Sequence, residues 1–226
     1  MKSEYKDVAY KLDYDVEHFE RNNISDWNKD LDFQNYEGYS NRKYYGTESF
    51  GHPNPVIFTG YLPVVKFIDY PQPDNNWNVM SRRMYETLLS VGEFPHRVIP
   101  IAIVDWRVQK KDCYDAGGEL RKEICLWNYL AIQMTAHIKV FDEENSVFTK
   151  DGDGFYDVYK FAFKVPKEGL PPIFRIPENR TETFVSAQAR QAMKEAKING
   201  TRYEPLAPSG TSFLDHPVIL PAKSYL

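Results

Sequence analysis

The sequence predicts an α+β protein with two related strand-helix-strand units around a mixed or antiparallel sheet, a β-hairpin, and an irregular, aromatic-rich N-terminal segment. Three observations lead to this fold class. One motif occurs twice at a constant offset of 105 residues, several apolar runs are typical of strands, and a Gly-rich turn is flanked by alternating apolar residues. With 226 residues, the chain is long enough to bury a substantial core.

The repeated motif reads "VMSRRMYETLLSVGEFPHRVIPI" at 79–101 and "FVSAQARQAMKEAKINGTRYEPL" at 184–206. In both copies an apolar pair precedes a Ser, Ser81 or Ser186, whose side-chain oxygen suits a helix N-cap. Apolar residues then recur at helical spacing: Met84, Leu88 and Val91 in the first copy, and Ala189, Met193 and Ala196 in the second. We therefore expect two capped helices, each followed by a short strand that ends at Pro100 or Pro205.

Neighbouring segments complete the expected fold. Each copy extends upstream through a turn containing Pro and Asn to an apolar pair, so the repeat covers about 67–101 and 173–206. The run at 61–71 reads as a strand ended by Pro. The run at 124–134 is apolar throughout and fits a buried helix as well as a strand, but its Trp, Tyr and Ile content favours a strand. The stretch at 146–166 predicts a hairpin.

The acidic side chains are concentrated near the N-terminus. Residues 1–50 hold 11 acidic and 7 basic side chains and carry the whole net charge of -4. We expect 1–55 to form an acidic, aromatic-rich segment and 56–226 to form the α+β domain. The chain shows no basic patch that would bind nucleic acid and no apolar run that would cross a membrane, so we expect neither partner.

Candidate chemistry in the sequence is weak. "KDGDGFYD" offers Asp151, Asp153 and Asp157 as calcium ligands, but it lacks the remaining ligands of an EF-hand loop, and we expect a hairpin turn at 151–154. The histidines have no metal-ligand spacing, so we expect no metal and no cofactor. Cys113 and Cys125 are expected to be reduced thiols. Cys125 and His137 are expected to be core or edge residues, and no catalytic residue is assigned.

The segment "SDWNKDLDFQNY" combines acidic and aromatic side chains in the pattern of a protein-binding surface. Aromatic anchors supply interface energy, and carboxylates steer a basic partner. The candidate binding residues are Asp26, Trp27, Asp30, Asp32 and Tyr36. The alternative is a solvated face with its Trp side chain packed into the core.

The order of elements from 60 to 206 resembles the eleventh family of immunity proteins in bacterial polymorphic toxin systems, formerly a domain of unknown function known from myxobacteria. That family carries an "F/I-V-S-x-x-x-x-x-x-L" segment and a "G-v-x-F-x-P" ending. The matching residues are Phe184-Val185-Ser186 and Gly200-Thr201-Arg202-Tyr203-Glu204-Pro205. The first copy, from Val79 to Pro100, matches the upstream helix and strand of the family. The opening 55 residues have no counterpart in its pattern.

The N-terminus lacks the apolar core of a signal peptide and the chain has only two cysteines, so we expect a cytoplasmic protein. The resemblance implies that it binds and neutralises a cognate toxin protein and has no catalytic residue. The acidic and aromatic segment is then the candidate toxin-binding site. Two other functions stay open: a cytosolic hydrolase or transferase with Cys113 or Cys125 as nucleophile, and an adaptor between two host proteins. The toxin and the oligomeric state, a homo-oligomer included, are not specified by the sequence.

Overall fold

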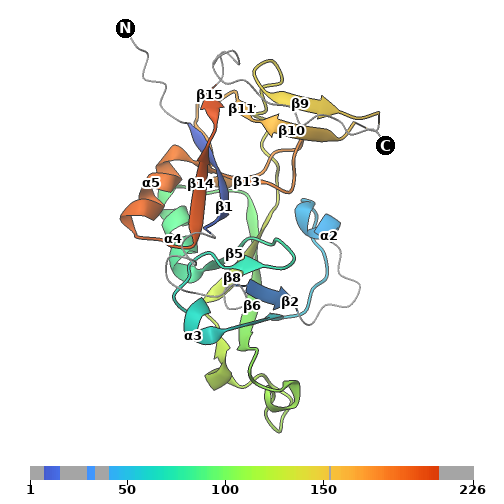
Figure 1. The fold of residues 1–226 in the computed structure, drawn as a ribbon, viewed down its shortest axis with the longest axis vertical. Helices are drawn as coiled ribbons and strands as arrows, with labels where there is room; N and C mark the ends of the chain where they lie inside the picture. Colours follow the sequence, from blue (N-terminus) through green and yellow to red (C-terminus); the bar gives the residue numbers. More distant parts are fainter. Residues whose placement is uncertain (1–7, 16–29, 34–40, 153, 209–226) are drawn as a thin grey trace, which may run out of the picture.

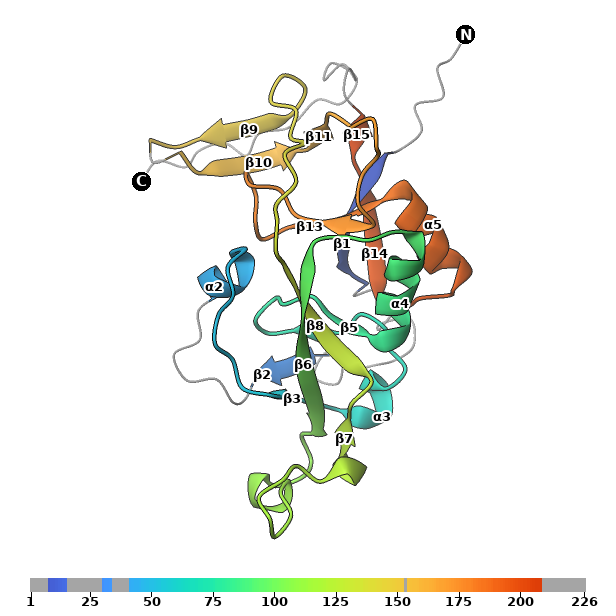
Figure 2. The same cartoon turned by 180° about the vertical axis from the view of Figure 1, so that it is seen from behind.

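The computed structural model describes residues 8–15, 30–33, 41–152 and 154–208, and it confirms the α+β fold class. In these residues, strands β1 to β15 and four α-helices form an elongated body (Figures 1 and 2). The hairpin of β9 (Val147–Lys150) and β10 (Tyr156–Lys160) is at one end, and the segment between β6 (His96–Asp105) and β7 (Cys125–Leu126) is at the other. The two longest helices, α4 and α5, lie side by side between these ends.

The first repeat forms one strand-helix-strand unit. It consists of β5 (Val79–Ser81), α4 (Arg82–Val91) and β6 (His96–Asp105). A strand from later in the chain, β8 (Tyr129–Met134), lies between β5 and β6 and is antiparallel to both. Ser81 is opposite Tyr129, and Pro100 is opposite Leu130. The unit is therefore a three-stranded antiparallel ladder with a helix that connects its outer strands.

The second repeat has the same arrangement. It consists of β13 (Thr183–Ser186), α5 (Ala187–Glu195) and β14 (Thr201–Pro205), with β1 (Ala9–Tyr14) between its two strands. Ser186 is opposite Ala9, and Pro205 is opposite Tyr10, so the register matches that of the first unit. The central strand comes from a later part of the chain in the first unit and from an earlier part in the second.

Matching hydrogen bonds support the equivalence of the two units. Arg97 donates to Gln133 across the first ladder, and Arg202 donates to Asp13 at the equivalent place in the second. Both N-cap predictions are confirmed: Ser81 Oγ accepts from Met84 N at 3.1 Å, and Ser186 Oγ accepts from Ala189 N at 3.2 Å. The repeat seen in the sequence is therefore a repeat of structure.

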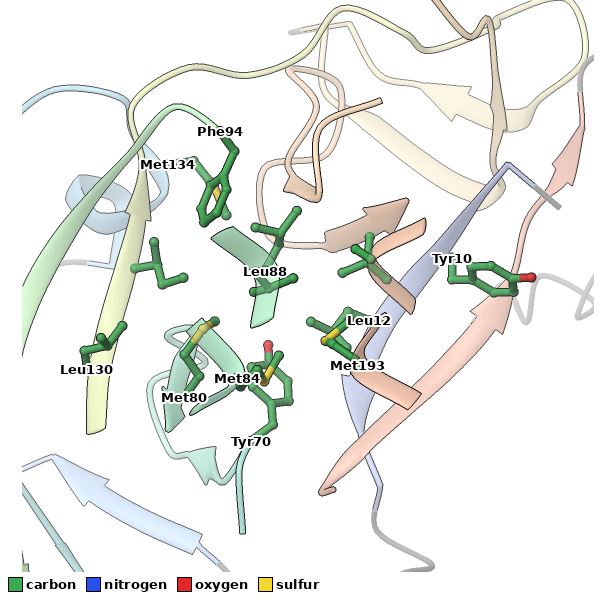
Figure 3. Close-up of a cluster of buried hydrophobic side chains, with 14 residues drawn as sticks. Tyr10, Leu12, Tyr70, Met80, Met84, Leu88, Phe94, Leu130, Met134 and Met193 are labelled. Atoms are coloured by element: carbon green, nitrogen blue, oxygen red, sulfur yellow. The ribbon is translucent and has the colours of Figure 1, made fainter. Parts of the chain in front are cut away.

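The two units bury their helices in one common core, shown in Figure 3. Met80, Met84 and Leu88 of the first unit lie near Leu12 and Met193 of the second, and all five are at least 96% buried. Burying such side chains contributes about 1.5 to 3 kcal/mol each relative to exposure. The shared core makes the two units depend on each other for stability.

Smaller elements complete the sheets. The seven-stranded sheet runs β4-β2-β3-β6-β8-β5 with β7 paired to β6, and the four-stranded sheet runs β12-β13-β1-β14. Their remaining strands are β2 (Asp30–Phe33), β3 (Val56–Gly60), β4 (Gln72–Pro73), β7 (Cys125–Leu126) and β12 (Ile173–Phe174).

The predicted hairpin is formed by β9 (Val147–Lys150) and β10 (Tyr156–Lys160), and β11 (Ala162–Phe163) pairs with β15 (Ala207–Pro208). The remaining helices are α2 (Asn41–Tyr45), α3 (Leu62–Val65) and the 3-10 turns Lys110–Asp112 and Lys122–Ile124.

Two strand predictions were wrong. The run at 61–71 was expected to be a strand but contains the helix α3, because Pro63 fits the first turn of a helix. The strand of this region is β3, which precedes the run. Pro100 does not end its strand, because β6 continues to Asp105. Pro100 is the last residue paired with β8, and pairing with β3 begins at Ile101, so the missing N–H falls where β6 changes partners. The strand expected at 124–134 is present, divided into β7 and β8.

The boundary expected at residue 55 does not separate the sheets. From the segment described as irregular, β1 occupies the centre of the second unit, and β2 pairs with β3 and β4. Tyr10 and Leu12 are buried in the common core, which explains why isolated apolar residues form a strand here. In the described part of the chain, no helix is both long and apolar enough to span a membrane.

Candidate functional site

The predicted binding segment is only partly described. Asp26, Trp27 and Tyr36 lie outside the described residues, and the backbone of Asp30 is in β2. Asp32 is exposed and pairs with Thr59 of β3. Burial and the nearby charge of Asp32 raise the pKa of Asp74, whose carboxylate also accepts a hydrogen bond from Phe33 N. These two carboxylates lie near each other, while the binding role of the whole set stays a prediction.

The two thiols lie in a small apolar cluster with Ile57 and Val104, and neither forms a disulfide. Burial raises the pKa of the Cys125 thiol to about 11 and also raises the pKa of Cys113. A nucleophilic cysteine needs a lowered pKa, so this environment opposes the nucleophile hypothesis. No group of three or more potential metal ligands from His, Cys, Asp and Glu occurs among the residues that the structure describes.

His137 is held by different contacts from those of the thiols. Its Nε2 lies 3.1 Å from the carbonyl oxygen of Tyr45. Burial lowers its pKa, and the positive charges of Arg180 and Arg175 lower it further. Within the described residues, the groups that shift the pKa of His137 include no cysteine, and those that shift the pKa of the two thiols include no histidine. The contacts of His137 therefore do not support a pairing with Cys125 as base and nucleophile.

The Asp-Gly segment between β9 and β10 closes the hairpin. Asp151 Oδ1 accepts a hydrogen bond from Phe155 N at 2.8 Å, and the Asp151 backbone N–H donates to the Phe155 carbonyl at 3.0 Å. Gly154 has a φ of 84°, a left-handed conformation that suits glycine. The Asp151 carboxylate therefore stabilises the turn, while Asp153 lies outside the described residues.

An exposed Trp lies between two hollows on the first unit. Trp127, Asn54 and Pro55 line both a hollow of about 940 Å³ and an adjoining one of about 430 Å³. The larger hollow extends to Tyr114 and Arg121, and the smaller extends over β6 and α4 to Val98 and Arg82. We call this region the Trp127 surface. The Trp127 side chain is 41% exposed, although Trp is usually well buried.

The break between β7 and β8 places Trp127 on the surface. The residues on either side are fixed, because Cys125 pairs with Val104 of β6 and Asn128 O accepts a hydrogen bond from Arg82 N at 2.7 Å. Tyr129, the next strand residue, is buried and donates through its hydroxyl to the carbonyls of Val65 and Ile68. A rigid backbone therefore presents the exposed indole ring, as a binding anchor requires.

A third hollow, of about 420 Å³, lies where the two units meet. We call it the junction pocket. Its walls come from β1, from the end of α2, from the segment before β5 and from β13, and they include Tyr14, Tyr45, Tyr70, Asn78 and Thr183. The rings of Tyr14 and Tyr70 stack with their centroids 4.7 Å apart. Burial raises the pKa of both hydroxyls, so both stay protonated near neutral pH.

A buried guanidinium lies behind two residues of the pocket wall, Tyr45 and Thr183. Arg175 is 1% exposed, and its Nε donates to Thr183 Oγ1 at 3.2 Å. The guanidinium carbon is 4.7 Å from the ring centroid of Tyr45 and 5.2 Å from that of Tyr44. Burial raises the pKa of the pocket residues Tyr14, Tyr45 and Tyr70, and the positive charge of Arg175 opposes that rise. The cation therefore lies close to several walls of the junction pocket.

Three buried donor atoms at this place have no hydrogen-bond partner in the described structure. They are Nη1 and Nη2 of Arg175 and Nδ2 of Asn78. The oxygen of the Asn78 amide is satisfied, since it accepts from Tyr70 and Thr183 at 3.0 Å each. Buried polar groups in folded proteins are nearly always paired, and buried charges are paired with particular regularity. The junction pocket is therefore rich in unused donors.

Sequence reasoning missed both Trp127 and Arg175. Trp127 was placed inside a buried run, because periodicity does not reveal a break of two residues between strands. Arg175 stands between Phe174 and Ile176, both buried, so the charged residue in an otherwise apolar "PIFRIP" was a usable signal.

Comparison with protein-family models and with curated proteins found no match for this chain.

Proposed function

We propose that this chain is a cytoplasmic immunity protein, similar to the eleventh immunity family, that binds and neutralises a cognate bacterial toxin. The motif resemblance supports the family, and the confirmed α+β repeat is consistent with it. The Trp127 surface carries the proposal of a protein partner, because a half-exposed Trp on a rigid backbone lies between two adjoining hollows. Interface energy is concentrated in such aromatic anchors, and hollows beside them receive side chains of the partner.

The environment of the thiols favours binding over cysteine chemistry. A hydrolase or transferase that uses Cys125 needs thiolate near neutral pH, whereas burial raises its pKa to about 11. An adaptor between host proteins would also use an exposed aromatic surface. The adaptor and the immunity protein differ in the partner, so the experiment must identify that partner.

The direct test is co-expression of the chain with the toxin encoded by a neighbouring gene. We expect protection of the host cell and co-purification of the two proteins. Trp127→Ala should weaken binding by about 2 kcal/mol, which is about 30-fold in Kd, as truncation of a hot-spot residue does. Calorimetry or surface plasmon resonance measures the change.

Phe155→Ala is the matched control, because Phe155 is 72% exposed and lies in the hairpin of β9 and β10, far from β7 and β8 (Figure 2). We expect this variant to bind normally. A folded Trp127→Ala protein with unchanged affinity would remove the Trp127 surface from the interface. Failure of the intact chain to bind any neighbouring gene product would exclude the immunity function itself.

The acidic and aromatic segment remains a second proposed part of the interface. Deletion of 1–50 is an unsuitable test, because it removes β1 from the centre of the second unit. Point substitutions preserve the sheet: we expect Trp27→Ala to weaken binding by about 2 kcal/mol. Asp32→Lys should mainly slow association at low salt, because peripheral charges steer the encounter. Unchanged affinity and rates in both variants would assign the interface to other residues.

A further inference from the structure

We propose that the junction pocket is a binding site for a small aromatic carboxylate, whose charged group pairs with Arg175. The site differs from the Trp127 surface, and the proposal does not depend on a toxin partner. It rests on a buried cation whose Nη atoms have no partner among the described residues, on the unused donor of Asn78, and on a hollow whose walls include three tyrosines.

The free donors define the ligand group. Among the described residues, the two Nη atoms of Arg175 have no partner at hydrogen-bond geometry, although the guanidinium is near enough to Tyr44 to oppose the rise of its pKa. A planar guanidinium presents such atoms to a carboxylate as a two-pronged donor. Asn78 Nδ2 supplies a further donor to the same carboxylate. The Nε of Arg175 is already bonded to Thr183, which fixes the orientation of the guanidinium. A carboxylate accepts several hydrogen bonds and also neutralises the buried charge.

The rim of the pocket favours a single negative charge over a double one. Asp13 and Glu182 both line the pocket, and each is paired, with Arg202 and with Lys11 respectively. Lys11 and Arg202 already form ion pairs with these carboxylates, so they add little attraction for a phosphate dianion. The tyrosine walls suit a flat, apolar body. The hollow of about 420 Å³ falls within the size range of small-molecule sites.

Tyr45 controls access to the guanidinium. Its ring centroid lies 4.7 Å from the guanidinium carbon and belongs to the pocket wall, so in our proposal this ring separates the buried cation from the hollow. The hydroxyl of Tyr45 is held by a long hydrogen bond of 3.3 Å to the carbonyl of Asn76, and the side chain is half-buried. Rotation of this side chain exchanges a cation-π contact for an ion pair with the ligand. Tyr44 keeps its own contact with the guanidinium and its buried hydroxyl bonds to the backbone.

The probe for this site is benzoate, with benzamide as the neutral molecule of the same shape and inorganic phosphate as the competing anion. Isothermal titration of the full chain should show saturable benzoate binding with a Kd of about 1 mM, typical for a ligand of this size. Benzamide should bind at least about tenfold more weakly, since it cannot neutralise the cation. In the wild-type chain, benzoate should also shift the side-chain amide resonance of Asn78.

Two variants test the residues. Arg175→Met should reduce benzoate affinity at least about tenfold, with folding checked by circular dichroism. Tyr45→Ala keeps the cation and removes the ring that lies over it. This variant should bind benzoate several-fold more tightly, because no free energy is spent on moving the Tyr45 ring away from Arg175. This variant also keeps the proposal testable if Arg175→Met does not fold.

Several outcomes would overturn the proposal. Equal binding of benzamide and benzoate would show that the charge is not recognised. Phosphate binding without benzoate binding would replace the ligand class. No saturable benzoate binding by either wild-type protein or Tyr45→Ala would assign Arg175 a structural role, and an unchanged affinity in Tyr45→Ala would refute the gating step.

Discussion

Asn78 and Thr183 occupy equivalent positions in the two repeats and are bonded to each other, with Thr183 Oγ1 donating to Asn78 Oδ1 at 3.0 Å across 105 residues of sequence. When two units are related by a two-fold axis, equivalent residues can contact each other only close to that axis. The packing of α4 against α5, also an equivalent pair, agrees with an approximate two-fold axis at this place. The axis therefore passes near the polar network of the junction pocket.

Thr183→Val should destabilise the protein by about 1 to 3 kcal/mol, the usual cost of leaving a buried polar group unpaired. The substitution keeps the shape of the side chain but removes the bond to Asn78 and the acceptor of Arg175 Nε. Urea denaturation at pH 7 measures the change in the free energy of unfolding.

Thr181→Val is the matched control for this substitution. Thr181 is exposed, and its hydroxyl bonds to the nearby Asn179. We expect a change within about 0.5 kcal/mol. Equal effects of the two substitutions would mean that the bond between the repeats adds nothing to stability.

The two N-cap serines should differ in their contributions. Ser186→Ala should cost about 1 kcal/mol, because it loses the cap of α5. Ser81→Ala should cost more, about 2 kcal/mol, because Ser81 also donates at 2.6 Å to Asp69, a buried carboxylate that binds Arg83. Thermal and urea unfolding of both variants measure the difference, and a larger cost for Ser186→Ala would contradict this account.

The elements that the sequence predicted correctly are those whose signals are local. A Ser before an amphipathic run specifies a helix start within a few residues, and both helices begin directly after Ser81 and Ser186. Asp-Gly pairs identify the hairpin in the same way, because the turn and its two strands are neighbours in the chain.

Pairings between distant segments were not predictable from these signals. The pairing of β1 with β13 and β14 joins residues about 170 to 200 positions apart, and no local pattern near Leu12 specifies it. Burial of Arg175 depends on α2 and β13 together, so the sequence indicates only that a charge stands in an apolar run. The candidate sites depend on such contacts, which explains why they were missed.

Cys125 should react slowly with alkylating reagents in the folded protein. With its pKa raised to about 11 by burial, the thiolate fraction at pH 8 falls by about 100-fold or more relative to an ordinary thiol. Iodoacetamide labelling followed by mass spectrometry gives the rate. Between pH 9 and 10.5 the rate should keep rising in the folded chain and level off in the urea-unfolded chain. Rapid labelling at pH 7 would restore the nucleophile hypothesis.

Gly200, the glycine of the family-like "G-v-x-F-x-P" ending, joins the second repeat to the segment before the first. Its φ is 77°, and an added Cβ would lie 2.9 Å from the backbone oxygen of Tyr70 and 2.7 Å from Ile68. Gly200→Ala should therefore destabilise the fold by more than about 2 kcal/mol, through a left-handed backbone and a clash with the main chain. Gly51→Ala is the control, since a Cβ there meets nothing within 4 Å, and it should be neutral or slightly stabilising. Urea denaturation measures both variants. A stable Gly200→Ala protein would show that the motif glycine is kept for a reason other than this close approach, and would direct the search for its role to the surface around Asn199.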